Sequence, residues 1–158
     1  TKVGPLVSSR QRERVEGYIA KGKQEGRLTT GGSRPQGFDQ GWFVEPTVFA
    51  DVDNNATVSR EEIFGPVLSV VPYGDESEAV ALANDSSYGL GGTVWSSDTG
   101  RAADVARKVR SGTVGVNHYV NEPVAPFGGI KDSGMGRELG PEGLHGYQVY
   151  KTIYLPPA

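Results

Sequence analysis

The chain has 158 residues, of which 36% are hydrophobic, with a formal net charge of -3 at pH 7, two histidines and no cysteine. A chain of this length buries roughly 70% of its unfolded surface, so we expect one compact domain, and without a basic excess or cysteine ligands we expect neither a nucleic-acid partner nor a metal site. No apolar run approaches the ~20 residues of a bilayer span, and no charged segment followed by an apolar one opens the chain, which predicts a cytoplasmic protein with no membrane partner.

The first predicted element is an amphipathic helix that begins after Ser8 and runs to Gly22 or Gly26. Ser8 and Gln11 have the spacing of a capping box, and three apolar residues then recur at helical spacing: Val15, Tyr18 and Ile19. Basic and acidic side chains are interleaved on the same segment: Arg10, Arg12, Glu13, Arg14, Glu16, Lys21, Lys23 and Glu25. Such a mixture is typical of a solvated face, so we assign it no function.

The following segments alternate between the strand and helix periods. Strands are predicted at residues 42–49, 67–71, 90–95 and 113–117, and helices begin at Asp75 or Ser77 and at Asp98. Pro46 favours an edge or a bend in the first of these strands. The order strand, helix, strand, helix, strand over residues 67–117 favours a parallel sheet covered by helices, and therefore an α/β fold. An alternating strand at residues 147–155 closes the chain.

Residues 61–66 (EEIFGP) form the first loop that could carry chemistry. In extended backbone, residues two apart point to the same side, so Glu62 and Phe64 would face one space while Ile63 faces the core. A carboxylate can accept hydrogen bonds from both hydroxyls of a ribose, and a ring can lie against a planar heterocycle. The alternative is an acidic surface loop whose phenylalanine fills the core before a strand.

Residues 125–138 (APFGGIKDSGMGRE) form the second such loop. Lys131 is wrongly placed for a phosphate-binding P-loop, and Leu139 stands where a dinucleotide fingerprint would have its third glycine. The glycines instead indicate tight turns or close backbone approach, so we expect a loop that shapes the lining of a pocket. His118 and His145 are interpreted as ordinary polar residues rather than as a base or a ligand.

Four segments are distinctive in combination: EEIFGPV at 61–67, NDSSYGL at 84–90, GTVGVN at 112–117 and PFGGIKDSGMGRE at 126–138. In residues, order and spacing they resemble the NAD(P)-dependent aldehyde dehydrogenase superfamily. The resemblance covers essentially the whole chain. It implies part of the three-layer α/β catalytic domain of that family over residues 1–146, and an oligomerisation strand with a tail over residues 147–158.

The resemblance implies oxidation of an aldehyde to a carboxylic acid with NAD or NADP. Enzymes of that family form a thiohemiacetal on a catalytic cysteine and use a glutamate as general base for hydrolysis of the thioester. In the family both residues lie upstream of the segment that resembles residues 4–6, and this chain has no cysteine. We therefore expect the C-terminal portion of such an enzyme, with no catalytic residue of its own and inactive when isolated.

Five residues match family positions that line the cofactor or the substrate. By resemblance, Glu62 accepts the hydroxyls of the nicotinamide ribose, Phe64 packs near the nicotinamide, and Leu90 walls the nicotinamide side. Tyr119 and Phe127 lie in the segment that resembles the aldehyde tunnel loop. Residues 122–123 (EP) depart from the family there, so substrate specificity is not carried over.

The resemblance also implies an aldehyde as small-molecule partner and a homo-oligomer in which residues 147–155 extend the sheet of a neighbouring subunit. Two other functions stay open at this point. The chain could be an autonomous nucleotide-binding module, which NAD binding by the purified chain would favour. It could also be a non-catalytic fragment that oligomerises, which assembly without nucleotide binding would favour.

Overall fold

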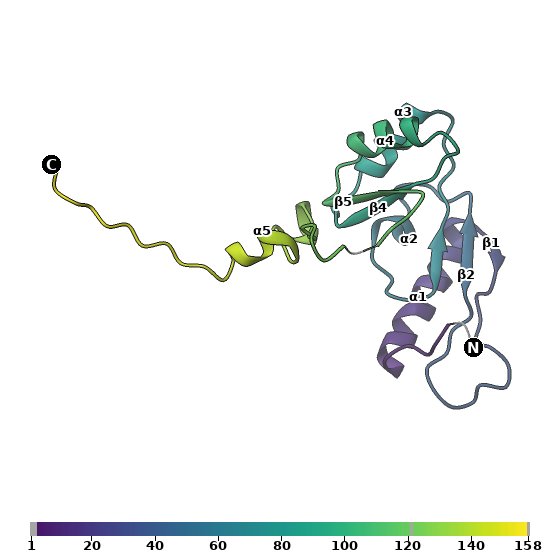
Figure 1. The fold of residues 1–158 in the computed structure, drawn as a ribbon. Helices are drawn as coiled ribbons and strands as arrows, with labels where there is room; N and C mark the ends of the chain where they lie inside the picture. Colours follow the sequence, from purple (N-terminus) through teal and green to yellow (C-terminus); the bar gives the residue numbers. More distant parts are fainter. Residues whose placement is uncertain (1–2, 121, 158) are drawn as a thin grey trace. The chain divides into compact units, whose positions relative to one another are not determined.

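The computed structural model describes residues 3–120 and 122–157, and the chain divides into two compact units (Figure 1). Unit 1 is Thr1–Gly74 and unit 2 is Asp75–Ala158. This differs from the expected single compact domain. The boundary predicted between residues 146 and 147 stays a prediction, and residues 1, 2, 121 and 158 of the predicted segments lie outside the described residues.

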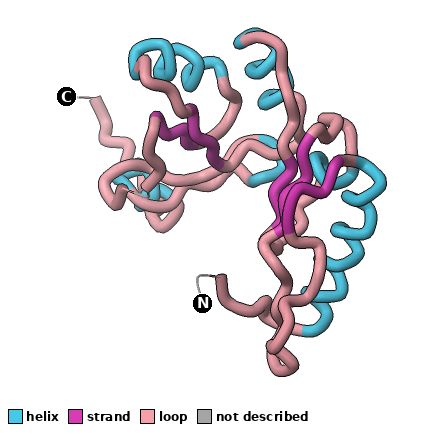
Figure 2. Tube along the Cα trace, turned by 90° about the vertical axis from the view of Figure 1, so that its right-hand side faces the viewer, coloured by secondary structure: helices cyan, strands magenta, loops and turns pink. Residues whose placement is uncertain are grey.

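Unit 1 is a three-stranded sheet with helices packed on it. Its elements are α1 (Ser9–Glu25), β1 (Arg27–Thr30), β2 (Thr47–Ala50), α2 (Thr57–Arg60) and β3 (Val67–Ser69). The strand order is β1-β2-β3, in which β2 pairs antiparallel with β1 and parallel with β3. Figure 2 shows the strands in magenta and the helices in cyan. The strand predicted from residue 42 begins only at Thr47, directly after Pro46, whose nitrogen has no hydrogen to donate to a ladder.

Helix α1 confirms the helix predicted after Ser8. The Ser8 hydroxyl accepts a hydrogen bond from the Gln11 backbone N–H at 3.2 Å, and the buried residues lie on one stripe: Val15, Tyr18, Ile19 and Gly22. The capping box is only half formed, however, because the Gln11 side chain donates to other acceptors. The N-cap is therefore made by Ser8 alone, and the amide of Gln11 is used elsewhere.

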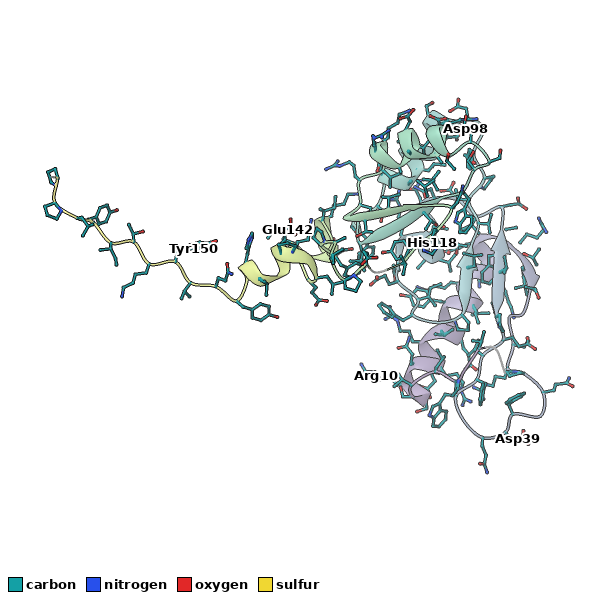
Figure 3. All side chains as sticks on the ribbon, in the orientation of Figure 1. Arg10, Asp39, Asp98, His118, Glu142 and Tyr150 are labelled. Atoms are coloured by element: carbon teal, nitrogen blue, oxygen red, sulfur yellow. The ribbon has the colours of Figure 1, made fainter. Side chains whose placement is uncertain are left out.

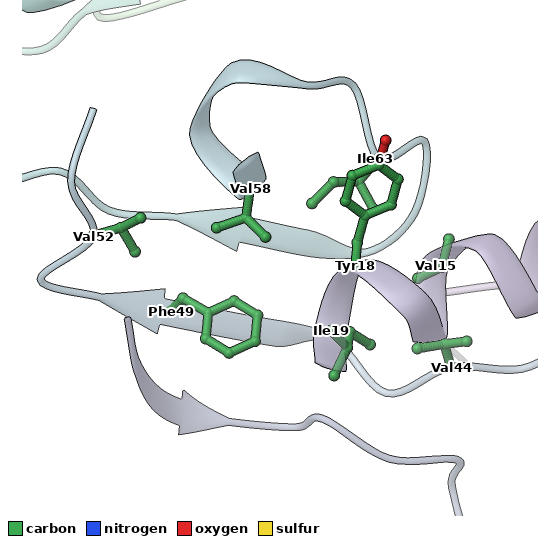
Figure 4. Packing of buried hydrophobic residues seen from close by; sticks show 8 residues of the cluster. All are labelled: Val15, Tyr18, Ile19, Val44, Phe49, Val52, Val58 and Ile63. Atoms are coloured by element: carbon green, nitrogen blue, oxygen red, sulfur yellow. The ribbon is translucent and has the colours of Figure 1, made fainter. Parts of the chain in front are cut away.

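The core of unit 1 is one cluster of eight side chains (Figure 4). It consists of Val15, Tyr18, Ile19, Val44, Phe49, Val52, Val58 and Ile63. Phe49 is completely buried at its centre, and Gly22 of α1 lies directly against its ring. Burial of apolar area of this kind is the main stabilising contribution in a small domain, so α1 is held to the sheet through this cluster.

Unit 2 contains two parallel strands and two longer helices. Its elements are α3 (Glu76–Asn84), β4 (Gly91–Val94), α4 (Thr99–Lys108), β5 (Thr113–Val116), the 3₁₀ turn η1 (Lys131–Ser133) and α5 (Gly140–His145). β4 pairs in parallel with β5. Asp75 and Asp98 are the N-caps, each accepting a backbone N–H three residues on at 2.9 Å, which confirms both predicted helix starts.

The α/β class is confirmed, but the single parallel sheet predicted over residues 67–117 is wrong. β3 pairs with β2, while β4 and β5 form a sheet of their own. The alternation of periods indicates which segments are strands, whereas pairing depends on contacts between distant segments. No described helix is both long and apolar enough to cross a membrane.

The strand predicted at residues 147–155 is not a strand in this structure. Residues 147–157 contain no helix or strand and appear in Figure 1 as an extended yellow trace, with Tyr150 labelled on it in Figure 3. Its large apolar side chains are strongly exposed: Tyr147, Val149, Tyr150, Ile153, Tyr154 and Leu155. A β-ladder requires a backbone partner, and no described residue provides one here.

Gly22→Ala is expected to destabilise unit 1 although alanine is the better helix former. A Cβ at Gly22 would lie 2.5 Å from the Phe49 ring. Overpacking a core costs about 1–3 kcal/mol, which offsets or exceeds the roughly 1 kcal/mol gained in helix propensity. The matched control is Gly17→Ala, where a Cβ meets nothing within 4 Å. Urea unfolding of both variants makes the comparison, and equal midpoints would contradict the packing argument.

Candidate functional site

The loop at residues 61–66 connects α2 to β3 in unit 1, and its side chains alternate as predicted. Ile63 is 8% exposed and belongs to the core, whereas Phe64 is 72% exposed and Glu62 is also exposed. The alternative in which Phe64 fills the core is therefore wrong. A large ring kept in solvent beside a carboxylate is available to a ligand.

The backbone at Phe64 is in the left-handed region, with φ 54°. Residues other than glycine adopt this region rarely, and such positions cluster at functional sites because the surrounding structure must impose them. The next residue, Gly65, lies so close to Val15 of α1 that a Cβ there would be 2.5 Å from the valine side chain. The turn is thus packed directly onto α1.

The two adjacent acids of this loop have different environments. The Tyr18 hydroxyl donates to the Glu61 carboxylate at 2.6 Å. Within the described residues, no hydrogen bond or ion pair is found for the Glu62 carboxylate. A carboxylate that accepts no internal hydrogen bond is free to accept hydroxyl protons from a ligand, so Glu62 rather than Glu61 is the candidate acceptor.

Side chains of α1 also hold the backbone of this loop. The Gln11 amide donates to the carbonyls of Ile63 at 3.1 Å and Phe64 at 3.0 Å. The Arg14 guanidinium donates to the Glu62 carbonyl at 2.8 Å and to the Tyr18 hydroxyl at 3.1 Å. Sequence reasoning missed these contacts, although the spacing of Gln11, Arg14 and Tyr18 puts them on one face of a helix.

The charged residues of α1 are mostly exposed, as predicted, but several of them also make contacts. Besides the contacts of Arg14, the Arg12 guanidinium lies 5.0 Å from the centre of the Trp42 ring, and Lys23 donates to the Gly32 carbonyl at 3.1 Å. A surface cavity of about 550 Å³ lies beside Phe64 and is lined by Ser8, Arg10, Gln11, Arg14 and Phe64. Charged α1 residues thus border the exposed ring.

Helix α2, which precedes the loop, is capped from α1 rather than by its own residues. Its N-cap position is Ala56, which has no side-chain acceptor, and the Glu25 carboxylate accepts the Val58 N–H at 3.1 Å instead. The hydrogen bond from the Thr57 side chain is the main cause that lowers the pKa of Glu25 below its usual value, with backbone hydrogen bonds adding to it. The loop is consequently anchored to α1 on its upstream side as well.

The remaining candidate residues lie in unit 2. Leu90 directly precedes β4 and is partly exposed, and Tyr119 follows β5. The Tyr119 hydroxyl lies against Gly91, in the space that a Cβ of Gly91 would occupy. The structure therefore brings Tyr119 next to the residue that follows Leu90. Glu62 and Phe64 belong to unit 1.

The loop at residues 125–138 is pinned to the start of β4 through Gly89. The Gly89 carbonyl accepts the N–H groups of Ile130 and Gly112, each at 3.0 Å, and its own N–H is bound by the Ser133 hydroxyl at 3.0 Å. A Cβ at Gly112 would overlap the Gly128 carbonyl. The predicted close backbone approach is confirmed, and it occurs beside Leu90.

Phe127 and Lys131 stabilise this loop in different ways. Phe127 is half-buried and exchanges two backbone hydrogen bonds with Glu138, both at 2.7 Å. The Lys131 ammonium donates to the carbonyls of Asn84 at 3.0 Å and Ser86 at 2.8 Å. Those carbonyls lie at the C-terminal end of α3, where a cation is favoured. Lys131 thus has a structural contact that motif reasoning did not indicate.

His118 and His145 are both exposed, and Figure 3 labels His118. Among residues 3–120 and 122–157, no group of three or more histidine, aspartate or glutamate side chains is arranged to hold a metal ion. The structure therefore concentrates the candidate chemistry on the acid and ring of the first loop and on the residues around Gly89.

Comparisons of the sequence agree on one family. The family model described as Aldehyde dehydrogenase family matches residues 1–153. A geranial dehydrogenase from Castellaniella defragrans is 58% identical over 155 residues, covering 98% of this chain and 32% of that protein. A betaine aldehyde dehydrogenase from Brucella ovis is 50% identical over 159 residues, covering 98% of this chain and 33% of that protein.

Solved structures give the same family. A Mycobacterium tuberculosis aldehyde dehydrogenase complexed with NAD+ matches with a TM-score of 0.94 at 54% identity, over 98% of this chain and 32% of that one. A Staphylococcus aureus betaine aldehyde dehydrogenase in complex with NAD+ matches with a TM-score of 0.89 at 46% identity, over 94% of this chain and 30% of that one.

The fold is that of an α/β chain, and its candidate site presents the Glu62 carboxylate and the Phe64 ring on a turn that α1 holds in place. The chain belongs to the aldehyde dehydrogenase family, as its resemblance implied. It spans about a third of the length of the curated relatives that it matches.

Lys131→Met is expected to lower the stability of unit 2. Methionine keeps the apolar stem but removes the ammonium that binds two carbonyls, and hydrogen bonds to charged groups contribute roughly 1.5–3 kcal/mol. Lys151→Met, on the exposed terminal segment, is the matched control. Thermal unfolding of both variants tests this, and a control that loses as much stability as Lys131→Met would show that Lys131 is not a specific contact.

Proposed function

We propose that this chain forms the C-terminal part of an enzyme that oxidises an aldehyde to a carboxylic acid with NAD or NADP. The observation that carries the proposal is the turn at residues 62–64, where an exposed carboxylate without an internal partner among the described residues and an exposed ring lie two residues apart, the ring residue in the left-handed backbone region. Family membership supplies the reaction class. The exposure of both groups supports a ligand with a hydroxylated part and a flat part.

The described residues fit a nicotinamide dinucleotide. The Glu62 carboxylate accepts the two ribose hydroxyls, because it has free lone pairs and no internal donor among the described residues. The Phe64 ring packs near the nicotinamide. For Leu90, which belongs to unit 2, the role of walling the nicotinamide side is proposed from the family resemblance alone. When bound, the cofactor supplies the hydride acceptor. These residues orient it, and none of them transfers a proton.

Tyr119 and Phe127 are proposed to line the path of the aldehyde. Tyr119 is partly exposed beside Gly91, and Phe127 lies half-buried in the loop pinned to Gly89. The names of two relatives refer to geranial and to betaine aldehyde. Because one of these aldehydes is apolar and the other cationic, the proposal specifies the aldehyde group and not the rest of the substrate. Solved relatives that contain NAD+ support NAD as the cofactor.

We infer that the 158 residues alone do not oxidise aldehydes. They contain no cysteine to form a thiohemiacetal, and a hydroxyl nucleophile would need an adjacent base. The chain's part in the enzyme is then to position the cofactor, to line the substrate path and to contact neighbouring subunits. Function as an autonomous nucleotide-binding module is disfavoured, because the contacts assigned here reach only the nicotinamide half of a dinucleotide.

Glu62→Gln in the full-length enzyme is expected to weaken cofactor binding and slow hydride transfer with little loss of stability. Glutamine keeps the size but replaces a charged acceptor, and hydrogen bonds to charged groups contribute roughly 1.5–3 kcal/mol against about 1 kcal/mol for neutral ones. The readouts are the dissociation constant for NAD, the rate of appearance of reduced nucleotide with aldehyde supplied, and the melting temperature.

Glu13→Gln is the matched control, since Glu13 is an exposed acid of α1 outside the turn. We expect it to leave the kinetics unchanged. Unchanged kinetics for Glu62→Gln together with a large fall in melting temperature would give Glu62 a structural role and remove the basis of the proposed function.

A second expected outcome is that the 158-residue chain associates in solution through residues 147–155. Six large apolar side chains of this β-prone segment are strongly exposed, and an unpaired segment of this kind is a template for strand pairing with a second chain. Thr152→Pro removes a backbone donor in the middle of the segment and should lower the assembly state. Light scattering measures it, and a stable monomer with a folded circular dichroism spectrum would contradict the expectation.

A further inference from the structure

We propose that Gln11, Arg14 and Tyr18 act together as positioning residues that preset the turn at residues 61–64 for the cofactor. We call these three side chains the α1 clamp. The inference rests on the proposed function of Glu62 and Phe64, and it assigns to α1 a role in that function beyond packing of the core.

The α1 clamp contacts each of four consecutive residues of the turn. Tyr18 donates to the Glu61 carboxylate, Arg14 donates to the Glu62 carbonyl, and Gln11 donates to the carbonyls of Ile63 and Phe64. Along α1 the order is Gln11, Arg14, Tyr18, and along the turn the contacted residues run in the opposite direction. The turn therefore lies antiparallel to one face of the helix and is held along its whole length.

The Gln11 side chain is directed to the turn and not to the start of its own helix. Gln11 is three residues beyond the N-cap Ser8, where a capping box would direct its side chain back to the N-cap N–H. Its amide instead donates to two carbonyls more than fifty residues away in sequence. Arg14 likewise extends to the turn, although an exposed guanidinium on a helix needs no partner. Both side chains reach the turn, and Arg14 in addition donates to the Tyr18 hydroxyl of its own helix.

The α1 clamp also explains why only one of the two adjacent acids is available. Arg14 donates to the Tyr18 hydroxyl at 3.1 Å, and that hydroxyl donates to Glu61 at 2.6 Å. This relay draws the Glu61 carboxylate toward α1. Meanwhile Arg14 binds the backbone carbonyl of Glu62 and leaves its carboxylate exposed. The same three side chains thus hold the Glu61 carboxylate in a structural contact and leave the Glu62 carboxylate available to a ligand.

Presetting matters because Phe64 has φ 54°, a conformation that the chain does not favour by itself. Gln11 binds the Phe64 carbonyl, and Val15 packs on Gly65 directly after it. A turn that is already ordered pays no further conformational entropy when the ligand binds, which raises affinity without any new contact. Loss of the α1 clamp should therefore weaken cofactor binding even though none of its members is assigned a cofactor contact.

The test is Gln11→Glu in the full-length enzyme. Glutamate has the same shape but no donor for the two carbonyls, and an acid in the first turn of a helix favours the helix, so α1 should not lose stability. We expect the dissociation constant for NAD to rise about tenfold with only a small fall in melting temperature, from loss of the two hydrogen bonds. Gln24→Glu, an exposed position in the last turn of the same helix, should leave the dissociation constant unchanged, with a small fall in melting temperature because an acid is unfavourable at a helix C-terminus.

A double-mutant cycle with Glu62→Gln separates positioning from an independent effect. If Gln11 acts through the turn, Gln11→Glu should change NAD binding less than about threefold when Glu62 is already glutamine. Carbonyl carbon chemical shifts of Ile63 and Phe64 in the 158-residue chain should also move in Gln11→Glu and not in Gln24→Glu. The shifts report whether the two hydrogen bonds are lost, and the coupling with Glu62→Gln is the readout that a merely structural role of Gln11 would not produce.

The results of these experiments distinguish failure of the α1 clamp from failure of the proposed function. If Glu62→Gln weakens cofactor binding but Gln11→Glu does not, or if the two effects simply add, the α1 clamp is overturned and the function of Glu62 stands. If Glu62→Gln alone leaves cofactor binding unchanged, the proposed function fails and the inference fails with it. A large fall in melting temperature for Gln11→Glu would also overturn the α1 clamp.

Discussion

The close approach of α1 to the sheet and to the turn is the constraint on which unit 1 depends. Two glycines permit it: Gly22 lies against the ring of Phe49, and Gly65 lies against Val15. Side chains at either position would push the helix away, by the steric argument that applies to any densely packed core. Because α1 lies this close, Gln11 and Arg14 are within hydrogen-bonding distance of backbone carbonyls in the turn. Core packing and the geometry of the candidate site are therefore set by one contact surface.

Unit 2 uses the same physical device at a different place. Gly89 and Gly112 allow backbone segments to meet where a Cβ would collide with Ile130 or with the Gly128 carbonyl. The loop at residues 125–138 is thereby fixed beside Leu90 without a large apolar core, since Ala102 is the only buried hydrophobic residue among those described in this unit. Hydrogen bonds from Lys131 and Ser133 complete the attachment. Glycine content in such loops is a sign of close approach and need not indicate phosphate binding.

Local features of this chain could be predicted from the sequence, and the pairing of distant segments could not. The caps at Ser8, Asp75 and Asp98 depend on side chains within three residues, and the burial of Ile63 follows from alternation. The partner of β3 depends on contacts that no local pattern encodes. The acceptors of Gln11 and Lys131 were missed for the same reason, because each lies more than forty residues away in sequence. Residues 147–155 show the limit most clearly, since their alternation predicts a strand whose partner is absent from the described residues.

The Glu62 carboxylate and the Phe64 ring are both exposed, and no hydrogen bond or ion pair among the described residues engages the carboxylate. A carboxylate adjacent to a tyrosine hydroxyl could bind it, yet only Glu61 does so and Glu62 faces solvent. Phe64 is next in sequence to a core residue but is held outward by a backbone conformation that has to be imposed. Exposed apolar side chains are individually unremarkable, but an exposed ring held in a strained turn costs stability that the fold has to offset. A destabilising conformation of this kind is expected where the side chain binds a partner outside the chain. The functional proposal therefore rests on the turn and not on the surface cavities of unit 1.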